Sequence, residues 1–221
     1  MRFSAACSSS LAAALLAIAA WAGELREPAS LSLAELMDGM ATTAGVIADF
    51  SEQKQIALLE KPLSSSGTLY FVPPDRLARF TLKPETSALI IDGDELRFQQ
   101  GDGEKFDLSE NPMARVFVDN FIVLFNGDLP KLQGLYHTNF SAEGDDWTLI
   151  LEPRRSPLRG LVKQIALRGN LQGIREMVLQ NLDGDRTSTT LDVIETDYHF
   201  TNDQLEDLFV RGARPLSATA R

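Results

Sequence analysis

The residues best suited to acid–base or nucleophilic chemistry are scarce in this sequence. His137 and His199 are the only histidines, and either imidazole could act as a general base beside a serine hydroxyl. The sequence contains no zinc-protease helix motif, nucleophile elbow, phosphate-binding glycine loop or dinucleotide fingerprint. We therefore predict a protein that is not an enzyme. Hydrolysis of an acylated substrate through one of the two histidines stays open as the catalytic alternative.

Thiols and metal-binding patterns are also sparse. Cys7 is the single cysteine, which excludes an internal disulfide, a thiolate zinc site and an iron–sulfur cluster. Asp and Gly alternate at residues 92–94, 101–103 and 183–185, but none of these segments has the spacing and closing glutamate of a calcium loop. Because Asp-Gly is a strong hairpin signal, we predict turns there, with no metal and no cofactor.

Positive charge gathers at one place in an otherwise acidic chain. The 221 residues include 31 acidic and 21 basic side chains, a formal net charge of -10 that disfavours binding to nucleic acid. Four cations surround Ser156-Pro157, namely Arg154, Arg155, Arg159 and Lys163. This cluster is either a solvated hairpin loop or a docking loop for an acidic partner or an anionic lipid headgroup.

An unusually apolar helix is expected in the middle of the chain. Asn111-Pro112 can begin it and Gly127 can end it. One face is apolar, and the opposite face carries only Arg115 and Asp119 as charges, so the helix has to be covered on both sides. Strands below it could enclose a cavity for acyl chains; a dry core is the alternative. The candidate cavity lining is Phe50, Phe71, Leu77, Phe80, Phe117, Phe121, Phe125 and Trp147.

Extended segments with short turns surround this helix, which predicts an α+β protein with an antiparallel meander. A capping-box spacing at Ser32 and Glu35 predicts an amphipathic helix before the first strand, and a second short helix is expected around residues 129–136. The predicted strands cover residues 46–58, 66–72, 76–82, 87–91, 95–99, 147–152, 161–168, 174–180 and 186–194.

The N-terminus has the pattern of an export signal. Arg2 is the only charge in residues 1–22, an apolar run follows it, and Ala20-Trp21-Ala22 supplies a peptidase site before Gly23. We predict a cleaved signal peptide over residues 1–22, a single domain over 23–210 and a flexible tail over 211–221. The mature protein is then expected to be soluble in the periplasm of a Gram-negative-type envelope.

An ordered set of segments resembles the LolA family of periplasmic outer-membrane lipoprotein carriers, in particular its divergent LolA-related branch. The matching segments are 48–53 (ADFSEQ), 65–70 (SSGTLY), 74–77 (PDRL), 89–96 (LIIDGDEL), 147–153 (WTLILEP) and 183–188 (DGDRTS). The resemblance implies a strongly curved antiparallel sheet, an incomplete β-barrel whose concave apolar face is covered by a helical lid. It also implies a carrier that takes lipoprotein acyl chains from an inner-membrane exporter to an outer-membrane acceptor. We expect this carrier to be a monomer without catalysis.

One position departs from the family pattern. The lipoprotein carriers have an arginine just before the proline that ends the second strand, and that arginine helps to hold the lid closed. Pro73 stands at this position here, and the nearest arginines are Arg76 and Arg79. The cargo is therefore expected to be a lipoprotein or another lipid-like amphiphile. The alternative function is a lipid-sensing or envelope-assembly module that binds a protein partner through the basic loop.

Overall fold

The structure is a computed structural model that describes residues 31–211, 215 and 216. The expected signal peptide lies outside the described residues. The side chains of Phe117 and Phe121, both on the central apolar helix, also lie outside them. None of the helices in the described ranges has the length and hydrophobicity of a membrane-spanning segment.

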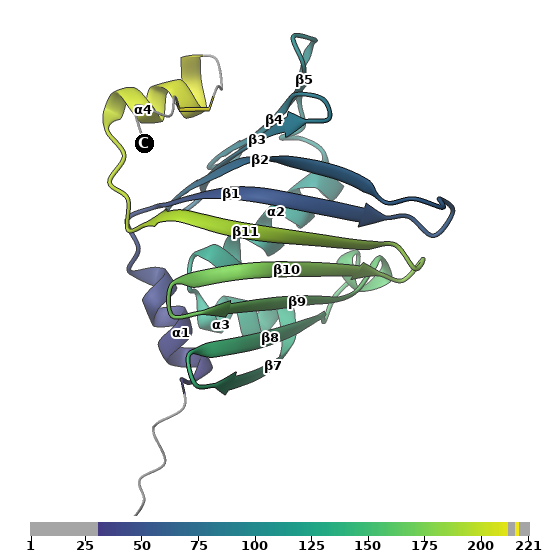
Figure 1. Cartoon of the computed structure of the whole chain (residues 1–221), viewed down its shortest axis with the longest axis vertical. Helices are drawn as coiled ribbons and strands as arrows, with labels where there is room; N and C mark the ends of the chain where they lie inside the picture. The colour runs from purple at the N-terminus through teal and green to yellow at the C-terminus, as the bar shows by residue number, and fades with distance from the viewer. Residues whose placement is uncertain (1–30, 212–214, 217–221) are drawn as a thin grey trace, which may run out of the picture. The chain divides into compact units, whose positions relative to one another are not determined.

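Eleven antiparallel strands form a single open sheet in the described part of the chain (Figure 1). Its order is β6-β5-β4-β3-β2-β1-β11-β10-β9-β8-β7, so the first and last strands pair at its centre. The strands are β1 Val46–Gln55, β2 Leu63–Val72, β3 Arg76–Lys83, β4 Ser87–Asp92, β5 Glu95–Gln100, β6 Lys105–Asp107, β7 Tyr136–Glu143, β8 Asp146–Pro153, β9 Val162–Asn170, β10 Gly173–Asn181 and β11 Arg186–Thr196. The predicted α+β fold, an open curved half-barrel with helices on its apolar face, is confirmed.

The two edge strands were absent from the sequence prediction. β6 has three residues and all are exposed, so it carries no alternation of apolar and polar side chains. β7 begins at Tyr136 directly after the short helix, without a turn residue between them, and the helix ends at Leu135. Helical and extended patterns run together there, which hides the boundary in the sequence.

Three helices cover the inner face of the sheet. They are α1 Leu33–Ala41, α2 Pro112–Phe125 and α3 Leu129–Leu135. Val123, Leu124 and Leu132 pack with the inward side chains of β8 and β9, such as Leu149 and Ile165. Ile122 packs over the inward side chains of β1 to β5. The apolar helix α2 therefore spans both halves of the sheet.

The outer face of β1 to β5 has a cover of its own. The residues after β11 form α4 Asn202–Glu206 and the π-helical turn η2 Asp207–Arg211. Leu208 and Phe209 are buried against Tyr70 and Phe80, whose side chains point away from the inner face. The chain returns to this layer at Leu216, whose backbone N–H donates to the Tyr70 hydroxyl over 3.1 Å. Both faces of this half of the sheet are thus packed.

Candidate functional site

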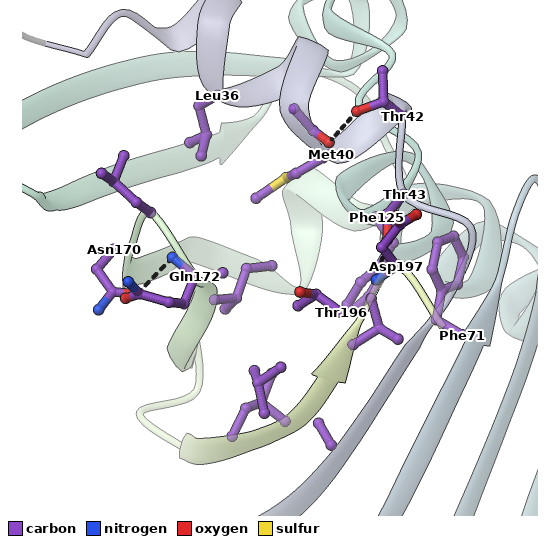
Figure 2. Close-up of a pocket in the computed structure, with 18 of the residues that line it drawn as sticks. Leu36, Met40, Thr42, Thr43, Phe71, Phe125, Asn170, Gln172, Thr196 and Asp197 are labelled. Carbon is purple, nitrogen blue, oxygen red and sulfur yellow. Dashed lines mark hydrogen bonds between the residues drawn. The ribbon is translucent and has the colours of Figure 1, made fainter. Parts of the chain in front are cut away.

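A cavity of about 470 Å³ lies between helix α1 and the centre of the sheet (Figure 2). Helix α1 contributes Leu36, Gly39 and Met40, and the end of α2 contributes Phe125. The floor is aliphatic and aromatic: Val46 and Ala48 from β1, Leu69 and Phe71 from β2, and Leu191 and Val193 from β11. The volume is in the range of sites that bury small ligands, and this lining suits an apolar one.

Polar groups border the cavity where α1 joins the first strand. Asp197, at a positive φ of 60°, directly follows β11. Its carboxylate accepts from the Ala44 N–H over 2.8 Å, and its own N–H donates to the Thr43 hydroxyl over 3.1 Å. These bonds tie the connection between α1 and β1 to the end of the last strand. They fix where α1 lies over the cavity.

The start of α1 is set by the predicted capping box, which is confirmed. The Glu35 N–H donates to Ser32 Oγ over 3.2 Å, and the Ser32 N–H donates back to the Glu35 carboxylate over 2.8 Å. Ser32 Oγ also donates to this carboxylate over 2.7 Å. Both hydrogen bonds that the Glu35 carboxylate accepts lower its pKa below the ordinary value. The bond from the Ser32 hydroxyl has the larger effect, and the bond from the Ser32 N–H has the smaller one.

Replacing Ser32 with alanine is expected to raise the pKa of Glu35 toward its ordinary value and to loosen α1. Because the folded-state pKa is lowered, the bonds stabilise at neutral pH, and this contribution is lost as the pH falls through the lowered pKa. Loss of the cap should lower the melting temperature by about 2–4 °C. An NMR titration of the Glu35 carboxyl measures the shift. Thr201→Ala, at the capping box of α4, should leave Glu35 unchanged; equal shifts in both variants would contradict the assignment.

A second, smaller cavity of about 50 Å³ continues along the inner face. Leu69, Phe125, Ile174 and Leu191 line both cavities and therefore form the partition between them. Phe50 is among the residues that line only the smaller one. The smaller space lies beside the end of α2, which contributes Leu124 and Phe125 to its lining.

The predicted lining residues lie at different depths around these cavities. Phe71 and Phe125 line the main cavity, with their ring centroids 5.3 Å apart. Phe50 lines the smaller cavity, and Leu77 packs with Phe50 and Phe71 in the same buried cluster without lining either space.

Two other predicted residues lie elsewhere. Phe80 points to the outer face and packs against Tyr70, with centroids 5.9 Å apart. Trp147 is buried on the inner face, where its indole N–H donates to the Asn170 carbonyl oxygen over 3.0 Å. It supports the β9–β10 turn, whose residues border the main cavity.

Sequence reasoning missed the contributions of α1, β11 and the β9–β10 turn. Leu36 and Met40 repeat at helical spacing, and Leu191 and Val193 alternate along their strand, so each pattern showed an apolar face. That these two faces meet across a cavity depends on contacts between segments that are far apart in the sequence. No local pattern in the sequence indicates it, because it follows from the pairing of β1 with β11.

The two arginines nearest to Pro73 lie on opposite faces of β3. Arg76 points outward, where its guanidinium makes two bonds of 2.6 and 2.9 Å to Asp92 and lies 4.7 Å from the centroid of the Phe209 ring. The side-chain bond to Asp92 raises the pKa of Arg76 above its ordinary value. Arg79 points inward and borders the smaller cavity.

Arg79 is the arginine on the cavity side. Its guanidinium carbon lies 4.1 Å from the centroid of the Phe50 ring, and its Nη2 lies 3.2 Å from a carboxylate oxygen of Glu52. The Thr189 hydroxyl donates to the other oxygen of Glu52 over 3.1 Å. This polar group bounds the apolar lining beneath α2.

The basic loop lies away from the cavity. Arg154 Nε donates to the Tyr136 carbonyl oxygen over 2.9 Å, and Arg155, Arg159 and Lys163 are exposed around the short 3-10 helix η1, Leu158–Gly160. The loop precedes β9, whereas the cavity residue Asn170 ends that strand. The loop and the cavity are thus at opposite ends of the sheet.

The candidate catalytic residues do not border the cavity. His137 is exposed on the edge strand β7, and His199 is exposed between β11 and α4. No group of three or more His, Cys, Asp or Glu side chains suited to a metal ion occurs in the part of the chain that is described. The arrangement suits binding of an apolar ligand.

Comparison with known proteins decides the family. The family described as outer membrane lipoprotein carrier protein LolA-like matches residues 26–204, most of the chain. The chain belongs to this family. LolA-like family members are carriers rather than enzymes, and this supports the coarse prediction of a binding role. No curated protein sequence matches the LolA-like chain significantly.

Several solved structures are similar to this LolA-like chain at low identity. A DUF1329 family protein from Desulfovibrio piger is 11% identical, with a TM-score of 0.48 over 82% of this chain and 95% of that one. A LolA superfamily protein from Nitrosomonas europaea is 9% identical, with a TM-score of 0.42 over 80% and 97%. The Pseudomonas aeruginosa MucA/MucB complex gives 15% identity and a TM-score of 0.41, and the match spans 77% of this chain and 57% of that one.

Proposed function

We propose that this LolA-like protein carries the acyl chains of a lipoprotein, or of another lipid-like amphiphile, in the cavity under α1. The observation that supports it is a mainly apolar space of about 470 Å³ left open on the inner face of the sheet, beside strands β1 and β2 whose outer faces are packed. Removing apolar surface from water is worth about 25 cal/mol per Å², so a chain that fills this space gains affinity with its length.

Uptake and release then depend on how α1 lies over the cavity. Met37 is buried in the core on the sheet side of the helix, while Leu36, Gly39 and Met40 line the cavity. No heavy atom outside the neighbourhood of Gly39 lies within 4 Å of the place where a Cβ would be. Space beside the helix allows a ligand to enter at modest cost. Differential affinity between donor, carrier and acceptor would set the direction of transfer.

The cellular setting is part of the same proposal. The protein works in the periplasm after removal of residues 1–22, as a monomer without catalysis. It receives cargo from an inner-membrane exporter and delivers it to an acceptor on the outer membrane. The LolA-like family and the N-terminal sequence pattern support this setting.

Gently purified protein is expected to retain its cargo. Native mass spectrometry should show an added mass, and fragmentation should release an acylated peptide if the cargo is a lipoprotein, or a free lipid if it is not. Delipidated protein should then take up a fluorescent fatty acid in a titration. Protein that carries no added mass and also binds no probe would refute the carrier proposal.

A further inference from the structure

Exposed leucines are concentrated in three segments at one end of the sheet, residues 54–63, 154–163 and 182–186, which we call the rim. Of the ten large apolar side chains that are exposed in the described residues, five lie here. They are Leu58, 94% exposed, Leu59, 47%, Leu63, 53%, Leu161, 42%, and Leu182, 58%. Single exposed leucines are ordinary on a protein surface, but a group of them marks an interaction site.

Hydrogen bonds hold the segments of the rim together. The Ala57 N–H donates to the Asp185 carboxylate over 3.0 Å, which ties the β1–β2 loop to the β10–β11 turn. The Leu182 N–H donates to the Leu161 carbonyl oxygen over 2.9 Å, which ties that turn to the β8–β9 loop. The first two of these hairpin tips lie side by side at the right of Figure 1. The leucines therefore belong to one surface.

The charge of the rim is opposite to that of the whole chain. Cations outnumber carboxylates seven to three in the rim, against 21 to 31 in the full sequence. Lys61, Arg155 and Arg159 form no ion pair within the described residues. Two of the three carboxylates, Asp183 and Asp185, accept hydrogen bonds from backbone N–H groups of the rim itself. The surface thus offers free positive charge around its leucines.

We propose that the rim docks on a membrane surface rich in anionic phospholipid. Leucines on projecting loops can enter the boundary between headgroups and acyl chains, while flanking Lys and Arg side chains pair with phosphate. The rim has no Phe, Tyr or Trp, and its exposed large apolar side chains are leucines, which are under-represented among the residues that dominate protein–protein interfaces. This composition favours a lipid surface over an acidic protein partner.

Docking through the rim leaves the cavity free. β1 begins beside the cavity at Val46 and ends at the rim with Gln55, nine steps along the strand that span about 30 Å at a rise of about 3.3 Å each. The membrane would thus lie at one end of the strands and α1 at the other. The inference goes beyond the proposed carrier function and does not depend on what the cavity holds.

Flotation with lipid vesicles tests the proposal. Protein made from the full chain is mixed with vesicles of phosphatidylcholine alone, or of equal parts phosphatidylcholine and phosphatidylglycerol, and centrifuged through a density gradient. We expect flotation with the anionic vesicles only, reduced by added salt. Combined replacement of Leu58, Leu59 and Leu182 by serine should weaken partitioning at least about tenfold. Arg155→Glu with Arg159→Glu should weaken it by about twentyfold or more.

Two matched controls test whether the effects are specific to the rim. They make the same kinds of substitution at an exposed apolar residue and at an exposed charged residue outside it. Val210→Ser removes an apolar side chain that is 60% exposed in η2, and Arg175→Glu reverses an exposed charge on β10. All variants share residues 1–30, so any contribution of that segment cancels. Thermal unfolding checks that each variant is folded.

Three results would overturn the proposal. They are absence of wild-type flotation, equal flotation with neutral and anionic vesicles, and equal loss in rim and control variants. Unchanged flotation of the rim variants, together with their loss of binding to an acidic protein, would assign the rim to a protein partner instead.

Discussion

Val193→Trp is expected to abolish uptake of an apolar ligand while the protein stays folded. Val193 is half-buried on β11 and lines the main cavity, so the larger indole ring would occupy the space that the ligand needs. We expect at least a tenfold loss of affinity for a fluorescent fatty acid, because the cavity would no longer hold the chain. Fluorescence titration measures the affinity, and thermal unfolding checks the fold.

The neighbouring position on the same strand provides the control. Ile194 is 44% exposed and does not line the cavity. Ile194→Trp should therefore bind the probe as the wild-type protein does. If Val193→Trp binds normally, or if both variants lose binding equally, the cavity under α1 is not the binding site.

Gly127→Ala is expected to destabilise the protein by about 3 kcal/mol and to displace α1. Gly127 has a φ of 66°, which L side chains rarely adopt, and it follows the end of α2. A Cβ at this position would collide with the Met37 carbonyl oxygen and would lie 2.5 Å from the Ala41 nitrogen, both in α1. Denaturant unfolding measures the loss of stability, and probe titration measures the effect on the cavity.

Gly144→Ala separates the cost of the positive φ from the cost of the collision with α1. Gly144 has a similar φ of 59° in the β7–β8 turn, but no heavy atom lies within 4 Å of the place where its Cβ would be. It should lose only about 1 kcal/mol, the cost of the backbone conformation, and keep its affinity for the probe. Equal losses of stability in the two variants would show that contact between Gly127 and α1 does not matter.

Much of the fold was readable from local patterns in the sequence. The Ser32 capping box, the Asp-Gly turns and the helix from Pro112 need only a few neighbouring residues to specify them. Alternating apolar residues predicted the longer strands in the same way. The edge strand β6 was missed because its three residues face solvent and carry no such alternation.

The cavity was not readable in the same way. The candidate lining was chosen from large aromatic residues, but Phe80 and Trp147 fill space in packed clusters instead of leaving it open. A cavity forms where side chains are too small to fill the gap, as beside Ala48 and Gly39. Which small residues face each other depends on contacts between distant segments, and a single sequence carries no direct sign of those.

The pairing of β1 with β11 also bears on how the protein is made. Val46 lies opposite Thr196, so the central pair of strands joins nearly the whole length of the domain. During synthesis or export, β1 and β10 keep unpaired edges until residues 186–196 have emerged. The cavity lies over this strand pair, which can form only late. Val46 and Ala48 of β1 line one side of it, and Leu191 and Val193 of β11 line the other. A ligand in the cavity would contact both β1 and β11, so bound cargo would stabilise the pairing of these strands in the newly folded chain.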